Sequence, residues 1–201
     1  MPKTKNVLIV IGLIGAVIFI YNFWSADLVL GDDTITVSAT VSQTVSCTAS
    51  TSTTAFGTLT TSAVSTSTPD VSLSMSCNYA PGCTLKVHDA GGGGNPGLYS
   101  ATTTHLISSA DATLVEGTAG YGIQASTNAN GSGGTLTINP TYDKTGDNVG
   151  GLTIADTNIS SSTEPIASRE TVVKYKAAIS GLTKAATDYA DTLTYSCTGN
   201  T

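Results

Sequence analysis

Polar and apolar residues alternate without interruption over residues 34–47 (TITVSATVSQTVSC). One face carries the apolar side chains, with Gln43 as its only polar member, and the other face carries Thr and Ser alone. The apolar positions are Ile35, Val37, Ala39, Val41, Val45 and Cys47. A period of two predicts a β-strand with one buried face. An ordinary strand has roughly 5–6 residues, and this run is more than twice as long. We therefore expect its first part to lie against a neighbouring chain. The alternative is one long edge strand within its own domain.

Several later segments show the same alternation. Residues 71–77 (VSLSMSC) and 83–88 (CTLKVH) flank a Pro81-Gly82 turn, which predicts a β-hairpin. Residues 171–179 (TVVKYKAAI) and 188–197 (DYADTLTYSC) predict two further strands. Residues 141–162 are rich in Gly, Asn, Asp and Ser, so we expect mostly loop there. The pattern predicts an all-β sandwich.

The N-terminus combines Lys3 and Lys5 with an apolar run over residues 7–24. A basic start followed by such a run is typical of a secretory signal. The run is also close to the roughly 17–25 residues with which a helix crosses a bilayer. Residues 1–31 are therefore either a signal peptide or a membrane anchor, in both cases a hydrophobic helix. Both alternatives place the remaining chain outside the cytoplasm, secreted or on the cell surface.

Composition limits the classes of partner. The net charge is −6 and charged residues make up only 11% of the chain. Without a basic patch to neutralise phosphates, nucleic-acid binding is excluded. The roughly 170 residues after the leader suit a single domain.

The sequence contains no recognisable reaction chemistry. His88 and His105 have no partner at a catalytic spacing, and no GxSxG, HExxH or phosphate-binding loop occurs. We therefore expect no enzyme, no catalytic residues, no cofactor and no metal site. Four cysteines in an exported domain predict two disulfides, which can pair in three ways.

The order of these segments resembles the spore coat protein U family, pilin-like domains related to archaic chaperone–usher pili. The similarity comprises the long strand ending in Cys47, then FGTL at 56–59, VSLSMSC at 71–77, TVVKYKAAIS at 171–180 and DYADTLTYSC at 188–197. It implies an incomplete immunoglobulin-like (Ig-like) sandwich over residues 47–201, whose missing strand a neighbour supplies. Residues 32–46 would be the donated extension, with Ile35, Val37, Ala39 and Val41 filling pockets of the neighbour.

The resemblance also implies a Cys47–Cys77 bridge. In an Ig-like sheet the strand beginning at Cys83 and the strand ending at Cys197 are antiparallel neighbours, so a Cys83–Cys197 bridge is then feasible. A Cys77–Cys83 link across the Pro-Gly turn is the alternative.

Together these features predict a secreted or surface-displayed structural subunit. Its partners would be other copies of itself or related surface subunits. The alternative is a monomeric Ig-like adhesion or binding domain, anchored in the membrane through residues 7–24.

Overall fold

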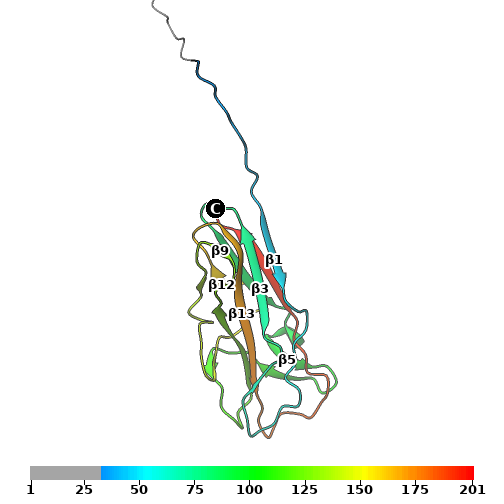
Figure 1. Ribbon diagram of the computed structural model, residues 1–201. Coiled ribbons are helices and arrows are strands. Elements are labelled where there is room, and N and C mark those ends of the chain that lie inside the picture. Colours follow the sequence, from blue (N-terminus) through cyan, green and yellow to red (C-terminus); the bar gives the residue numbers. More distant parts are fainter. Residues whose placement is uncertain (1–32) are drawn as a thin grey trace, which may run out of the picture. The chain divides into compact units, whose positions relative to one another are not determined.

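The computed structural model describes residues 33–201, and this part of the chain is built almost entirely of β-strands (Figure 1). One main sheet contains β1 (Val45–Ala49), β2 (Ser65–Thr66), β3 (Val71–Cys77), β8 (Gly120–Thr127), β9 (Ser132–Gly133) and β13 (Ile166–Ala178). It has the order β1-β3-β13-β2, with β8 and β9 also paired to β13. The other contains β4 (Cys83–Asp89), β10 (Thr137–Ile138), β12 (Thr157–Ser161) and β14 (Leu193–Gly199). Its order is β10-β12-β4-β14, and all these pairings are antiparallel.

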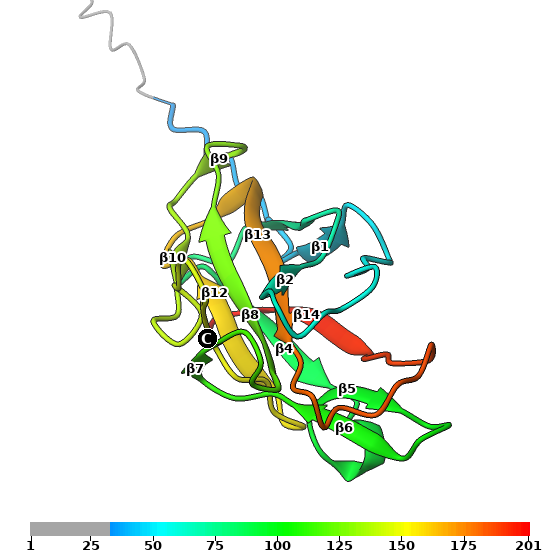
Figure 2. The same cartoon turned by 90° about the horizontal axis from the view of Figure 1, so that it is seen from below.

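Two small sheets and one short turn complete the fold. They are β5 (Gly97–Ser100) with β6 (His105–Ser108), β7 (Ala112–Thr113) with β11 (Asn148–Val149), and the 3-10 turn at Gly92–Gly94. Figure 2 shows the β5–β6 sheet at the end of the molecule away from β9.

The two main sheets share one hydrophobic core. In β3 the side chains of Val71, Leu73, Met75 and Cys77 are buried, and the serines between them are partly exposed. They pack in one cluster with residues of the other sheet such as Ile159. The predicted all-β class with two packed sheets is therefore confirmed.

The predicted hairpin of residues 71–77 and 83–88 is wrong. Strand β3 lies between β1 and β13, while β4 lies between β12 and β14 in the other sheet. The segment from Asn78 to Gly82 therefore crosses between the sheets. Gly82 has φ 80°, and a Cβ there would overlap the carbonyl oxygen of Ser162, so the crossing requires glycine. Alternation showed which side chains face inward but not which strand lies alongside.

Residues 141–162 are mostly loop, as expected, but they also contain the two-residue strand β11 and the five-residue strand β12. The sequence did not reveal β12 because the strand contains polar residues. One of them, Ser160, is 2% exposed, and its hydroxyl lies 2.7 Å from the hydroxyl of Thr171. Buried hydroxyls with a partner are tolerated in a core, so polarity alone did not exclude a strand here.

The beginning of the described chain is not strand. The chain divides into two units, Met1–Val41 and Ser42–Thr201, and β1 begins only at Val45. The alternative of one long edge strand over residues 34–47 is thus contradicted. The proposed signal or anchor, residues 1–31 with the apolar run 7–24, lies outside the described residues. Within residues 33–201 the structure contains no helix with the length and apolar character needed to cross a bilayer.

All four cysteines are paired, but not as the resemblance implied. The bridges are Cys47–Cys197 and Cys77–Cys83, with Cα–Cα distances of 6.0 and 6.5 Å. The expected Cys47–Cys77 and Cys83–Cys197 pairs are wrong, while the alternative Cys77–Cys83 link is confirmed.

The registers explain the correction. Cys47 lies opposite Met75 rather than Cys77, and Cys83 lies opposite Gly199 rather than Cys197. Each expected pair is thus a diagonal pair on neighbouring strands of one sheet, and the Cα atoms of such residues are typically about 7–8 Å apart. The Cα atoms of a disulfide are usually no more than about 6.8 Å apart. The observed bridges instead cross between the sheets.

Candidate functional site

The outer edge of β14 is the first element of the candidate site. Strand β14 pairs with β4 through all seven of its residues, from Leu193 opposite Asp89 to Gly199 opposite Cys83. It is the last strand of its sheet, and no described strand pairs with its other edge. An unpaired edge presents backbone donors and acceptors that another strand can bind.

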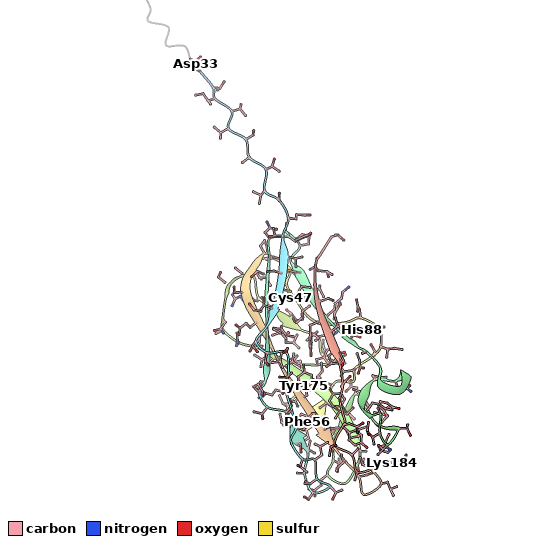
Figure 3. The ribbon with its side chains drawn as sticks, turned by 90° about the vertical axis from the view of Figure 1, so that its right-hand side faces the viewer. Asp33, Cys47, Phe56, His88, Tyr175 and Lys184 are labelled. Carbon is pink, nitrogen blue, oxygen red and sulfur yellow. A yellow bond between two sulfur atoms is a disulfide. The ribbon has the colours of Figure 1, made fainter. Side chains whose placement is uncertain are left out.

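The inward face of β14 is only partly covered. Leu193, Tyr195 and Cys197 pack against the main core but keep part of their surface exposed. Cys47, on the first strand of the opposite sheet, is also partly exposed. Its disulfide to Cys197 links the edge strands of the two sheets, and Figure 3 shows Cys47 on β1. The two sheets are therefore open to solvent along this side.

The extension at residues 33–41 is the second element. Ile35, Val37 and Val41 are 87%, 89% and 81% exposed, and Ala39 is exposed too. Large aliphatic side chains with this exposure, all on one face of an alternating segment, are unsatisfied apolar surface. The four predicted donor residues lie together in the first unit, Met1–Val41, and all four side chains are exposed.

Asn78 marks the point where the compact unit begins, and sequence reasoning missed it. Its side chain accepts a hydrogen bond from the Thr44 amide (2.7 Å) and donates one to the Ser42 carbonyl (2.8 Å). Its own amide donates to the Thr44 carbonyl at 3.3 Å. These bonds fix the chain immediately before β1, so residues up to Val41 are left outside the compact unit. An Asn after a strand ending in Cys was the only available signal.

A polar cluster lies under the beginning of β14. The hydroxyls of Tyr175 and Tyr195 are 2.7 Å apart, and Tyr175, labelled in Figure 3, is buried. Burial, more than any neighbour, raises the pKa of both tyrosines above the usual range. Tyr121, 2% exposed, packs edge-to-face against Phe56, and its pKa is raised well above the usual value, again mainly by burial.

Two carboxyl groups complete this cluster. Asp89 is fully buried and accepts hydrogen bonds from the amides of Gly91 (2.7 Å) and Gly97 (3.1 Å). Burial, followed by the neighbouring Asp89, raises the pKa of Asp191 to about 7. Tyr121 opposes this shift, yet Oδ2 of Asp191 is buried without a partner at hydrogen-bonding distance.

The remaining polar features have local structural roles. His88 lies 3.6 Å from Asp156 through Nδ1, and His105 packs edge-to-face on Tyr189. Among the described residues no group of three or more His, Cys, Asp or Glu could hold a metal ion. A cavity of about 280 Å³ is lined in part by Lys144 and Lys174. Both lysines form ion pairs, with Asp111 and Asp70 respectively.

Comparison with known proteins gives no assignment. No family model, no curated protein and no solved structure matches the chain. A function must therefore be argued from the two unsatisfied elements, the edge of β14 and the exposed extension.

Proposed function

We propose that this chain is a secreted or surface-displayed structural subunit, similar to pilin and spore coat protein U subunits, that assembles by strand addition between copies. In this proposal the sandwich is an incomplete Ig-like domain. The extension at residues 33–41 of one copy pairs with the free edge of β14 in the next. Other copies of the chain, or related surface subunits, are the partners.

One observation carries the proposal: a single copy contains both an unpaired strand edge and an unpaired strand-forming segment. Strand addition satisfies both, because backbone hydrogen bonds supply affinity and alternate side chains fill pockets. The alternation of Ile35, Val37, Ala39 and Val41 suits this geometry, since all four would face the same side.

Burial of the exposed side chains would offset much of the cost of strand addition. Burying a Val or Ile side chain contributes about 1.5–3 kcal/mol, so Ile35, Val37 and Val41, now almost fully exposed, would together contribute several. Ordering the extension and losing rotational freedom oppose association by a similar order of magnitude. Backbone pairing along β14 then decides the net affinity.

The disulfides support the proposed location. Two bridges and no free cysteine among residues 33–201 agree with folding in an oxidising compartment, as expected for a secreted or surface protein.

Deleting residues 34–41 from the full chain tests the proposal. Purified wild-type protein should form a ladder of multimers that resists mild detergent, and the deletion should give only monomers. A synthetic peptide of residues 33–44 should then bind the deleted protein and slow hydrogen exchange at β14 amides.

Two results would contradict the proposal. The first is an unchanged ladder after deletion. The second is a wild-type protein that stays monomeric at every concentration tested and whose amides on the outer edge of β14 are already protected from hydrogen exchange. That outcome would favour the monomeric adhesion or binding domain.

A further inference from the structure

Asp89 is fully buried at the end of β4, and Asp191 carries a buried, unpartnered carboxyl oxygen two residues before β14 begins. Asp89 ends β4 and lies opposite Leu193, so both side chains point to the same face of the sheet. Asp191 precedes Leu193 by two residues, just outside β14, and its Oδ2 is buried. The Ala90 amide donates to the Thr192 carbonyl at 2.9 Å, which extends the backbone pairing to this point.

The surroundings of this carboxyl pair contain acids and phenols. The groups that act on Asp191 are Asp89 from β4 and Tyr121 from β8, while Tyr175 from β13 and Tyr195 from β14 complete the titratable cluster. None of these groups carries a positive charge. Two carboxylates in such a place cannot both ionise without repulsion and loss of solvation.

We propose that Asp89 and Asp191 form a proton-dependent latch on the beginning of β14. With a proton on Asp191, the beginning of the strand is kept against the core beside the buried Asp89. When that proton leaves, repulsion loosens the beginning of the strand and weakens its ability to accept an added strand. The last step rests on the proposed function, whereas the loosening itself does not.

The direction of the pH effect follows from linkage. The folded-state pKa of Asp191, about 7, lies above the usual value of 3.8. The contribution of Asp191 to stability should therefore be fully present below pH 3.8 and be lost as the pH rises toward 7. Across that window the unfolding constant should rise with pH by at most about tenfold per unit, and level off above it. Partial exposure of Asp191 reduces the slope.

The test compares the full-length protein with Asp191→Asn in urea unfolding between pH 5 and 9. The wild type should lose stability as the pH rises, and Asp191→Asn should show a flatter profile. Asp143→Asn is the matched control, because Asp143 is an exposed aspartate with no described side-chain partner, and it should keep the wild-type slope. Parallel profiles for the wild type and Asp191→Asn would overturn the latch.

A second measurement does not depend on the variant folding. Carboxyl ¹³C chemical shifts of wild-type aspartates should include one that titrates near pH 7 instead of near 4. If every aspartate titrates at or below its usual pKa, the latch is wrong.

The link to assembly is tested separately. Wild-type multimers should dissociate more readily at pH 8 than at pH 6, and Asp191→Asn multimers should lose this difference. If the difference persists in Asp191→Asn, the latch does not control assembly, although strand addition stands. If no multimers form at any pH, the proposed function fails, and the unfolding profile alone still decides whether the latch loosens β14.

Discussion

Replacing Val37 with Asp should prevent copies from associating while leaving each copy folded. Val37 is 89% exposed and outside the described core, so the free energy of unfolding of one copy should change by less than about 0.5 kcal/mol. In an added strand the same side chain would be buried. The lost burial costs about 1.5–3 kcal/mol, and burying an unpaired carboxylate costs more still. A total near 3 kcal/mol already weakens the dissociation constant by about 100-fold.

The adjacent residue provides a matched control. Ser38→Asp introduces the same charge into the same exposed segment, but on the opposite face of an alternating strand. Its carboxylate would remain in solvent after strand addition, so association should weaken by less than about tenfold. Sedimentation over a range of concentrations measures both constants, and thermal unfolding monitors the fold. Equal losses for Val37→Asp and Ser38→Asp would refute a one-faced insertion of this segment, and so would no loss for either.

Three further predictions concern the domain itself. Replacing Cys47 and Cys197 with Ser removes a bridge between residues 150 apart in sequence and should lower the free energy of unfolding by about 5 kcal/mol in denaturant. Removing the Cys77–Cys83 bridge, whose sequence separation is 6, should lower it by about 2 kcal/mol. Equal losses would contradict the reasoning from loop entropy. The Asp188 carboxylate accepts hydrogen bonds from a Ser hydroxyl and the Thr102 amide, which lower its pKa to about 2. Its contribution should be present above pH 4 and lost on acidification toward 2, seen as faster Thr102 amide exchange in the wild type but not in Asp188→Asn. Gly82→Ala should destabilise the domain by at least about 1–2 kcal/mol in thermal unfolding, because φ is 80° and the added Cβ has no space; a neutral effect would show that the crossing between sheets can relax.

The sequence predicted which side chains face the core better than it predicted which strands pair with each other. Over residues 171–179 the alternation places Val173, Tyr175, Ala177 and Ile179 on one side; the first three are buried in β13 and Ile179 is partly buried. That face depends only on local backbone geometry, so a short pattern suffices. The pairing of β3 depends on which edges are free after the whole chain has folded, and nothing within residues 71–88 contains that information.

The same dependence on strand pairing explains which parts of the candidate site could be predicted from the sequence. Ile35 and Val37 were recognisable as an unsatisfied apolar face, because exposure of such residues needs an explanation in any fold. Asp191 was not recognisable as a partly buried acid, since its position near the end of β4 is set only when β14 aligns with β4. The disulfide partners were missed for the same reason, because registers decide which cysteines come within reach.

An edge strand must keep its position before a partner binds, and β14 is fixed at three points in addition to its pairing with β4. Before the strand, the amide and carbonyl of Ala190 pair with Tyr99 at 3.0 and 2.9 Å. Near its end, Cys197 is bonded covalently to Cys47. Beyond it, the Asn200 amide donates to the Gly82 carbonyl at 2.9 Å. A strand fixed in this way loses little freedom when another strand binds, which removes part of the entropic cost of association. The beginning of β14, between Ala190 and Cys197, is then where a change in the charge of Asp191 has the most freedom to act.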